Sequence, residues 1–405
     1  MSRIEIHNKL HYIFLLLIAF TLPFGKFTPL FIGLLLVNWL VEGGLIKKLK
    51  AVVNSKLTVT FILLYAIHII GLLYTANMKA GSFDLEVKMS ILIFPILLSS
   101  KPLYKKEQDQ IFMGFIIGLI YAAVYMLSRS FYIYMISGEN TFFYINFSVL
   151  IHSSYMAMYM NLGVVWLLIN VLKTDASKKI IGNFLSFLII GLFVLIILLL
   201  SSKTGILLLL LIVFTAILYY VFAQKKYVFG IISSFGLIIL LGFTYTQVPQ
   251  VKARLDNFLL AFNSETKKET MNSTSVRMLI WESAQEIIKE NPVIGVGTGD
   301  AKEELNKVYE KNGIVNASKL SYNAHNEFFQ ILVSLGAIGG VILLLNLFFP
   351  MYISFQKKNY IYLIFILIIT FNFFTESMLE TKAGVMFYAY FNALLCFVKP
   401  DREIK

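Results

Sequence analysis

A histidine stands immediately before a long uncharged stretch near the C-terminus of the chain. In SYNAHNEFFQILVSLGAIGGVILLL, residues 321–345, His325 and Asn326 come directly before the apolar run. A helix that begins near Asn326 would point its positive dipole end at His325, which favours a neutral ring able to accept a proton. The position predicts a general base, while a histidine that caps the helix or lies among lipid headgroups remains the alternative.

Two cations elsewhere in the chain are candidates for binding an anion. Arg277 begins a predicted amphipathic helix, where the helix dipole gives a cation no stabilising role, and its guanidinium can hold two phosphate oxygens at once. Lys203 lies in the turn SSKTG between two apolar segments, where an ionisable group is costly unless it faces a cavity or a partner. A solvated arginine and a lysine that extends to the headgroups remain the alternatives.

Further candidate substrate contacts gather on the same predicted face of the membrane. They are polar or aromatic residues at segment ends or in turns, namely Arg129, His152, Tyr155, Trp281, Asn326 and Glu376, with Glu380 and Lys382 beside the last. Alone, each is explained as well by an ion pair or an interfacial anchor, although Trp281 is also able to stack on a sugar. Their convergence beside a long external connection predicts a polar site on that face.

No pattern in the sequence predicts a metal or another cofactor. The five histidines are scattered, and Cys396, the only cysteine, lies in an apolar segment, so no metal site is expected. The stretch GVGTGD, residues 295–300, follows Asn-Pro and a predicted helix rather than a strand. Because it also lacks the Lys-Ser/Thr of a phosphate loop, it is expected to be a turn.

The composition is that of a polytopic membrane protein. Of the 405 residues, 58% are hydrophobic and 14% are charged, whereas a soluble domain has roughly 45–50% apolar and about 25% charged residues. The net charge is +12, but the basic residues lie in short clusters between apolar segments rather than along one soluble face. Membrane lipids, and not nucleic acid, are therefore the expected surroundings.

Twelve apolar segments are candidates for membrane-spanning helices, which need about 20 residues when they cross fully. They are Leu10 to Phe24, Phe27 to Val41, Leu57 to Tyr74, Val87 to Leu98, Ile111 to Met135, Val149 to Leu172, Ile180 to Leu200, Thr204 to Phe222, Tyr227 to Tyr245, Asn326 to Met351, Tyr360 to Phe374 and Ala383 to Val398. The connections on the side of the membrane that would hold the N-terminus carry most of the Lys and Arg residues. Both termini are therefore expected in the cytoplasm.

One connection is much longer than the others and is expected on the outer face. Two helices are predicted in it: RMLIWESAQEIIKE, which Asn291-Pro292 ends, and a second helix that Asp300 caps, with Glu303 completing a capping box, before Asn312-Gly313. The expected architecture is an all-α membrane protein. Residues 1–245 would form the first nine spans, residues 246–325 the external loop and residues 326–405 the last three spans.

Four stretches of the chain form a recognisable pattern. They are SSKTGILLLLL, Arg277 and Trp281 followed by NPVIGVGTGD, HNEFFQILVSLGAIGGVILL, and ESMLETKAGVMFYAYFNALL. In these stretches the chain resembles the O-antigen ligase family of bacterial envelope enzymes. The resemblance implies about twelve spans in a GT-C-like fold, a large periplasmic loop and a place in the bacterial inner membrane. It also implies inverting transfer of a glycan from undecaprenyl diphosphate to an acceptor hydroxyl, without metal or nucleotide.

The resemblance also implies roles for individual residues. His325 matches the catalytic histidine that activates the acceptor hydroxyl, and Arg277 matches the loop arginine that holds the diphosphate. Lys203 stands where the family more often has arginine, a change that keeps the charge but loses the two-pronged hydrogen bonding of a guanidinium. Fixed cations of this kind would neutralise the leaving group as a metal does elsewhere.

The acceptor is left open by these residues. Ligation of O-antigen to lipid A core is the leading hypothesis, while an O-antigen polymerase or an O-linked protein oligosaccharyltransferase of the same superfamily is the alternative. A lipid or glycan transporter is the alternative from another class. Transport predicts broken helices and ionisable residues deep in the membrane, whereas the charges here are expected to gather at one surface.

Overall fold

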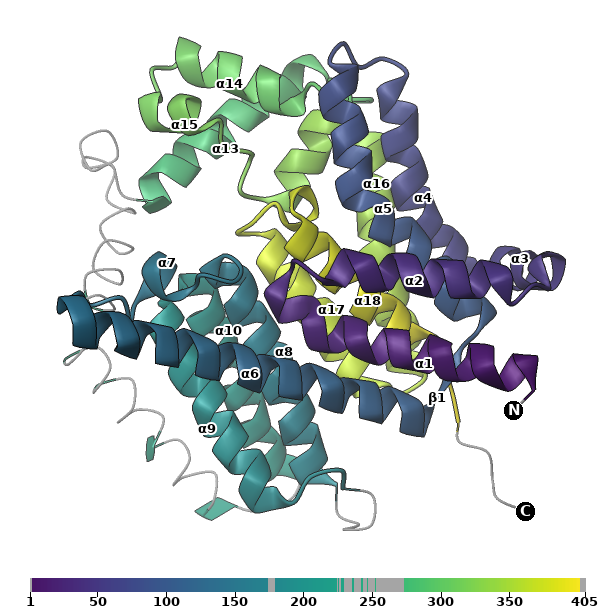
Figure 1. The fold of residues 1–405 in the computed structure, drawn as a ribbon. Coiled ribbons are helices and arrows are strands. Elements are labelled where there is room, and N and C mark those ends of the chain that lie inside the picture. The colour runs from purple at the N-terminus through teal and green to yellow at the C-terminus, as the bar shows by residue number, and fades with distance from the viewer. Residues whose placement is uncertain are drawn as a thin grey trace. The chain divides into compact units, whose positions relative to one another are not determined.

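The computed structural model describes residues 2–173, 179–223 and 273–400, together with isolated positions between 225 and 252 (Figure 1). Within this part of the chain the secondary structure is helical except for one short parallel pair of strands, β1 (Leu103–Tyr104) and β2 (Val398–Lys399). The chain divides into two compact units, Met1–Gly118 with Val276–Lys405, and Leu119–Ser275. Each unit is therefore described by itself.

The first unit is built around the helix nearest the C-terminus, α18 (Lys382–Cys396). Apart from its first two residues and its last, every residue of α18 is buried, because this uncharged stretch rich in Phe and Tyr is apolar all round. Tyr390 contacts Phe94 at 5.1 Å between ring centroids, and its hydroxyl donates to the Leu15 carbonyl at 2.6 Å. The surrounding helices are α1 (Arg3–Thr21), α2 (Thr28–Val41), α3 (Leu45–Asn54), α4 (Lys56–Leu72), α5 (Met78–Ser100), the start of α6 (Lys105–Ser137), α16 (Glu327–Gln356) and α17 (Tyr360–Phe373).

The second unit holds the end of α6, α7 (Tyr144–Phe147), α8 (Ser153–Leu172), α9 (Asn183–Leu200), α10 (Lys203–Leu218) and a π-helical turn, Tyr219–Ala223. Small residues let two of these helices approach closely, since a Cβ on Gly205 would lie 2.4 Å from the Ala157 Cβ. At the same crossing the Asn161 amide donates to the Ala157 and Gly205 carbonyls, each at 2.9 Å. A buried polar side chain thus joins α8 to α10.

Each predicted apolar segment inside the described residues coincides with a helix, and the segment Tyr227 to Tyr245 lies outside them. By length and composition, five described helices can cross a membrane: α1 with its 3-10 extension (Leu22–Phe24), α6, α8, α9 and α16. The bent pair α2 and α3, at 114°, would make a sixth, and α4, α10 and α17 are shorter apolar helices. The chain is thus an all-α membrane protein, while twelve spans and their direction stay predictions.

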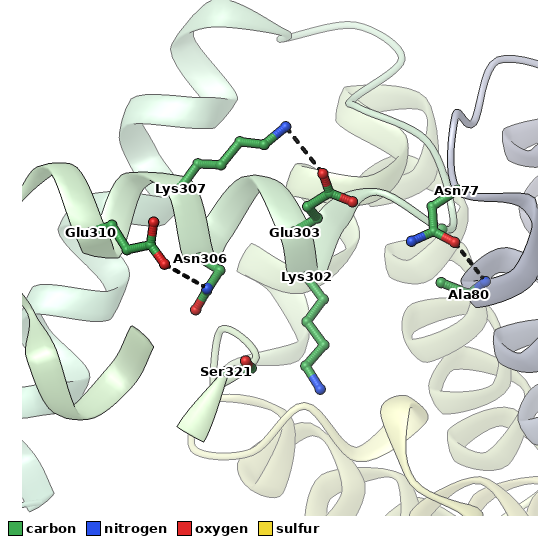
Figure 2. A pocket seen from close by; sticks show the side chains of 9 residues that line it. Asn77, Ala80, Lys302, Glu303, Asn306, Lys307, Glu310 and Ser321 are labelled. Carbon is green, nitrogen blue, oxygen red and sulfur yellow. Dashed lines mark hydrogen bonds and ion pairs between the residues drawn. The ribbon is translucent and has the colours of Figure 1, made fainter. Parts of the chain in front are cut away.

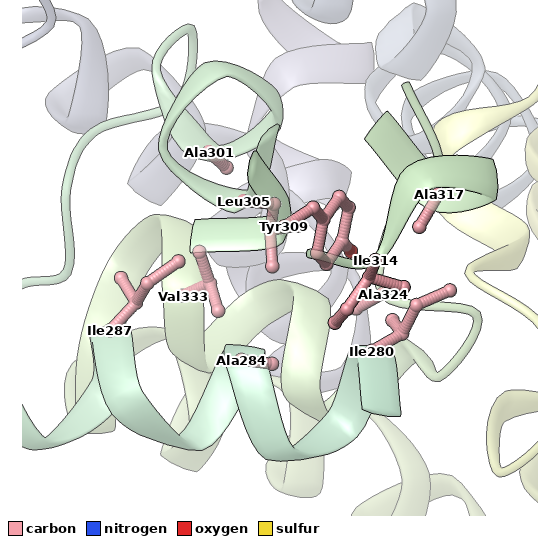
Figure 3. Close-up of a cluster of buried hydrophobic side chains, with 10 residues drawn as sticks. All are labelled: Ile280, Ala284, Ile287, Ala301, Leu305, Tyr309, Ile314, Ala317, Ala324 and Val333. Atoms are coloured by element: carbon pink, nitrogen blue, oxygen red, sulfur yellow. The ribbon is translucent and has the colours of Figure 1, made fainter. Parts of the chain in front are cut away.

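Three short helices precede α16 and share a hydrophobic core with it (Figure 3). They are α13 (Ser273–Glu290), α14 (Ala301–Lys311) and α15 (Val315–Leu320). The first two end as predicted, before Asn-Pro and Asn-Gly, whereas α15 was not predicted. The core contains Ile280, Ala284 and Ile287 of α13, Leu305 and Tyr309 of α14, and Val333 of α16, with Ala301, Ile314, Ala317 and Ala324.

The predicted capping box before α14 is wrong. Asp300 is the residue before the helix, but its side chain makes no capping hydrogen bond. Its two carboxylate oxygens instead accept from the backbone N–H groups of Ala76 and Asn77, each at 2.7 Å. Asp300 therefore ties the start of α14 to the turn between α4 and α5, because charge-assisted bonds to two unpaired N–H groups outweigh one local cap.

Helix α16 is broken at Gly336, and residues 292–297 repair the break. Gly336 has φ 59° and ψ −159°, a conformation restricted almost entirely to glycine. The N–H groups of Val296 and Gly297 donate to the carbonyls of Val333 and Ser334, each at 2.9 Å. In return the Ala337 N–H donates to the Pro292 carbonyl at 2.9 Å. The turn expected at GVGTGD is confirmed, and it satisfies backbone groups that would otherwise be orphaned inside the helix.

Replacing Gly336 with alanine is expected to destabilise the protein by about 1 to 3 kcal/mol, since the backbone conformation excludes a side chain. A Cβ there would also lie 2.3 Å from the Val293 carbonyl carbon. Gly33→Ala is the matched control, because a Cβ on that helical glycine meets nothing within 4 Å. Thermal unfolding in detergent compares the two variants. Equal midpoints would contradict the packing described at the break.

Candidate active site

His325 lies in the turn between α15 and α16, directly before the helix cap. The α16 cap is Asn326, whose side-chain oxygen accepts from the Phe329 N–H at 3.1 Å, so the predicted helix start is confirmed. The backbone of His325 has φ 45°, a left-handed conformation that few residues other than glycine adopt. Its N–H donates to Asn323 Oδ1 at 3.1 Å, and its ring meets the Tyr322 ring edge-on at 5.0 Å. The backbone bond holds the turn, and Tyr322 packs against one side of the imidazole.

The carboxylate of Glu376 joins the predicted base to the predicted phosphate-binding arginine. Arg277 Nη2 donates to Glu376 Oε1 at 2.8 Å, and His325 Nδ1 lies 3.4 Å from Glu376 Oε2. Glu376 is buried, while 22% of the His325 side chain and 30% of the Arg277 side chain remain exposed. Three candidates that lie 48 to 99 residues apart in the sequence thus form one cluster, which we call the His–Glu–Arg cluster.

The contact with Glu376 assigns different tasks to the two nitrogens of His325. A carboxylate can only accept a hydrogen bond, so it favours the tautomer with the proton on Nδ1. The lone pair is then on Nε2, the nitrogen that does not face Glu376. The same division of labour underlies general-base catalysis by histidine–carboxylate pairs. At 3.4 Å the contact is longer than a usual hydrogen bond, as is common in catalytic sites without substrate.

The segment that carries Glu376 is the linker between α17 and α18, and the start of α16 holds it in place. The Asn326 N–H donates to Ser377 Oγ at 3.2 Å, and its side-chain amide donates to the Phe374 carbonyl at 3.1 Å. Glu327, fully buried, accepts from the Leu379 N–H at 2.8 Å. The side chain of Asn326 is thus engaged in holding the linker, and a contact with substrate stays a prediction.

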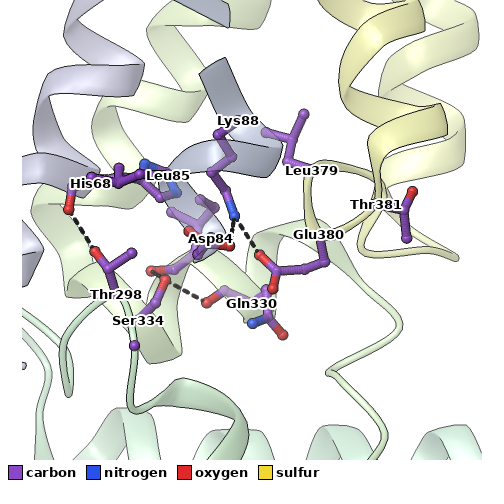
Figure 4. Close-up of polar contacts among 12 residues, drawn as sticks. His68, Asp84, Leu85, Lys88, Thr298, Gln330, Ser334, Leu379, Glu380 and Thr381 are labelled. Atoms are coloured by element: carbon purple, nitrogen blue, oxygen red, sulfur yellow. Dashed lines mark hydrogen bonds and ion pairs between the residues drawn. The ribbon is translucent and has the colours of Figure 1, made fainter. Parts of the chain in front are cut away.

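A buried ion cluster fixes the far end of the same linker (Figure 4). The ammonium of Lys88 in α5 lies between the carboxylates of Asp84 and Glu380, the latter at 2.8 Å. Only 1% of the Lys88 side chain is exposed. Burial raises the pKa of the Glu380 carboxyl above its ordinary value, and Lys88 acts in the opposite direction. Lys88 and Glu327 are thus buried beside this linker, and the gathering of charges at one surface of the membrane stays a prediction.

No role was predicted from the sequence for Asp84, Lys88 or Glu327. One signal was available, because Asp84 and Lys88 are spaced i,i+4 and so lie on one face of a helix. Glu327 offered no comparable signal, since an acidic residue in the first turn of a helix is ordinary.

Trp281 supports the turn that carries His325. Its indole N–H donates to the Ala324 carbonyl at 3.0 Å, and its ring lies 6.0 Å from that of Phe329. The Ala324 N–H is held as well, by Gln330 Oε1 at 3.0 Å. Trp281 thus has a demonstrated packing role, and stacking on a sugar stays a prediction.

The other predicted contacts lie in the second unit, where each has a local setting. Lys203 begins α10, which Ser202 caps by accepting from the Gly205 N–H at 3.2 Å. His152 caps α8, and its ring lies 6.2 Å from that of Tyr155. Arg129 donates to the Asn146 carbonyl at 3.1 Å. A shared site between these residues and the His–Glu–Arg cluster stays a prediction. In the described part of the chain, no group of three or more His, Cys, Asp or Glu side chains is placed to hold a metal.

Two comparisons with known proteins bear on these residues. Residues 186–344 match the family model described as O-antigen ligase, so the resemblance is confirmed over a range that includes Lys203, Arg277 and His325 but not Glu376. An uncharacterized protein of Haemophilus influenzae is 26% identical over 197 residues, which cover 45% of this chain and 47% of that protein. The chain thus spans about half the length of this curated relative.

Replacing Lys88 with methionine is expected to destabilise the protein by about 3 to 5 kcal/mol, because two largely buried carboxylates would lose their cation. Lys79→Met is the matched control, an exposed lysine on the same helix, and should change stability by less than about 0.5 kcal/mol. Chemical unfolding in detergent measures both. Adding Glu380→Gln to Lys88→Met should recover part of the loss, and a Lys88→Met variant as stable as the control would refute the ion cluster.

Proposed function

We propose that this chain is a glycosyltransferase of the bacterial inner membrane, and the match of residues 186–344 to the O-antigen ligase family model supports this. It moves a glycan from undecaprenyl diphosphate to a hydroxyl of a second glycan, and the leading acceptor is lipid A core. The reaction takes place on the periplasmic face, with both termini in the cytoplasm. The observation that carries the proposal is the His–Glu–Arg cluster, in which one buried carboxylate joins a base to a cation.

His325 acts as the general base in this reaction. The acceptor oxygen attacks the anomeric carbon, and the bond from that carbon to the phosphate oxygen breaks. The proton of the acceptor hydroxyl passes to Nε2 of His325, while Glu376 stabilises the positive charge that develops on the ring. A single displacement of this kind inverts the anomeric configuration.

Arg277 binds the diphosphate that leaves. A guanidinium has five N–H donors, and the contact with Glu376 uses one nitrogen, Nη2. The remaining donors are available to the phosphate oxygens, and the carboxylate holds the planar group in a fixed orientation. Lys203 is the second cation of the proposal. Fixed positive charges stabilise the departing diphosphate without reorganisation during the reaction.

Two features of the structure bear on the alternative of a transporter. One is the break in α16, and the other is the buried side chain of Lys88. Neither forms a site of the kind that transporters use, where unwound backbone lines a cavity or binds an ion. The break at Gly336 is filled by backbone bonds to residues 292–297, and Lys88 is paired with two carboxylates. These contacts support the enzyme over the transporter.

The decisive experiment uses purified full-length protein with a lipid-linked glycan donor and, in separate reactions, lipid A core or a second lipid-linked repeat as acceptor. His325→Ala should lower kcat by about 10² to 10⁴, the usual contribution of a general base, and Glu376→Gln should also lower it. His7→Ala is the control, a histidine on α1 bonded to Asn38. Product from lipid A core identifies a ligase, and product from the second repeat identifies a polymerase. Undiminished transfer by His325→Ala would exclude the proposed base, and donor movement without any transfer would favour transport.

Arg277→Ala should weaken use of the donor by about 1 to 3 kcal/mol, the cost of losing charge-assisted bonds to phosphate. Use of the donor by Arg277→Lys should fall between that of the parent protein and that of Arg277→Ala, because an ammonium keeps the charge but not the planar fork. Lys289→Ala serves as the control, since Lys289 is an exposed cation on the same helix. The measurement is kcat/KM for the donor at saturating acceptor. If all variants use the donor equally, Arg277 does not bind the diphosphate.

A further inference from the structure

A polar pocket of about 420 Å³ lies in the first unit beside the turn that carries His325 (Figure 2). One wall is a face of α14 that includes Lys302, Asn306 and Glu310, and another is the start of α5 with Asn77. Ser321, four residues before His325, also lines it. Its volume is in the range of small-molecule sites in proteins.

The two walls of this pocket are joined by direct bonds, so its shape is built before any ligand arrives. Asp300 holds the backbone of Ala76 and Asn77, as described above. Beside it, the Gly299 N–H donates to Thr75 Oγ1 at 3.2 Å, and the Thr298 hydroxyl donates to the His68 carbonyl at 2.7 Å. A preformed site avoids the entropic cost of ordering loops on binding.

The acidic side chains of the pocket are engaged with neighbours in the protein. Glu303 lies 3.3 Å from the Lys307 ammonium. Glu310 accepts from the Asn306 amide and from the Ser318 hydroxyl, each at 3.2 Å. Their charges and lone pairs are therefore partly satisfied without a ligand.

Three polar groups of the pocket are left available. Among the described residues, no carboxylate forms an ion pair with Lys302, and Figure 2 shows its side chain extending away from the Glu303–Lys307 pair. Asn306 Oδ1 is buried without a hydrogen-bond partner in the described structure. Asn77 uses its Oδ1 to cap α5 by accepting from the Ala80 N–H, which leaves its amide N–H groups to donate. The pocket thus offers a cation, an acceptor and neutral donors.

We propose that this pocket binds a sugar residue that carries a carboxylate or phosphate group, within the glycan whose reacting end lies at His325. Lys302 binds the anionic group, and Asn77 and Asn306 bind hydroxyls, which can both donate and accept. Four residues of chain span at most about 14 Å, so Ser321 and His325 lie within reach of one short oligosaccharide. The inference rests on the proposed function, and the glycan belongs either to the acceptor or to the donor.

Direct binding tests the pocket independently of catalysis. The probe is a trisaccharide of galacturonic acid, with its carboxyl-reduced form as the uncharged counterpart, titrated by calorimetry into the His325→Ala protein. Adding Lys302→Glu should raise the Kd of the charged probe about tenfold or more, as expected for a lost charge-assisted bond, and the charged form should then bind no more tightly than the reduced form. Lys319→Glu, an exposed lysine on α15, should leave both Kd values unchanged. Equal affinity of the Lys302→Glu and parent proteins for the charged probe would overturn the pocket, even if transfer is intact.

Kinetics with the full-length protein then identify the source of the sugar. Lys302→Glu should raise KM for only one of the two substrates, and that substrate is the one whose anionic sugar occupies the pocket. An unchanged KM for both substrates would overturn the proposal. If His325→Ala transfers glycan normally while Lys302→Glu still weakens the charged probe, the proposed function fails and the saccharide site stands.

Discussion

The carboxylate of Glu376 is the contact on which the arrangement of this site depends. A buried anion is costly unless its oxygens are bonded, and here they face Arg277 and His325. One side chain therefore links α13, the turn before α16 and the α17–α18 linker. Loss of this carboxylate would leave the base without an orienting partner and the guanidinium free to rotate.

The linker that carries Glu376 is held along its length rather than at a single point. Asn326 binds its beginning, Glu327 binds the backbone of Leu379, and Lys88 binds Glu380 at its end. Each bond comes from a helix and not from another loop. A catalytic group on a short linker thereby gains the precision of the helices beneath it, which a site needs to keep its reacting atoms aligned.

The short helices before α16 and the apolar helix itself depend on each other. The break at Gly336 exposes carbonyl and N–H groups that an apolar environment cannot satisfy, and residues 292–297 supply their partners. The same segment continues into Asp300, which binds the turn between α4 and α5. The path that repairs α16 thus also builds one wall of the polar pocket, so the proposed base and the proposed saccharide site share a single support.

The sequence by itself determined the local features of this protein. Apolar runs indicated the helices, Asn291-Pro292 and Asn312-Gly313 marked two helix ends, and Asn326 marked a start, because propensity, capping and turn chemistry act over a few neighbouring residues. The residue types of His325 and Arg277 were enough to propose a base and a phosphate ligand. Only the tertiary structure decided that Glu376 contacts both His325 and Arg277. It also decided that Asp300 binds the turn between α4 and α5 instead of capping α14, and that Lys88 is buried. These pairings connect residues far apart in the chain, and they follow from which helix faces pack together, a choice that no short stretch of sequence contains.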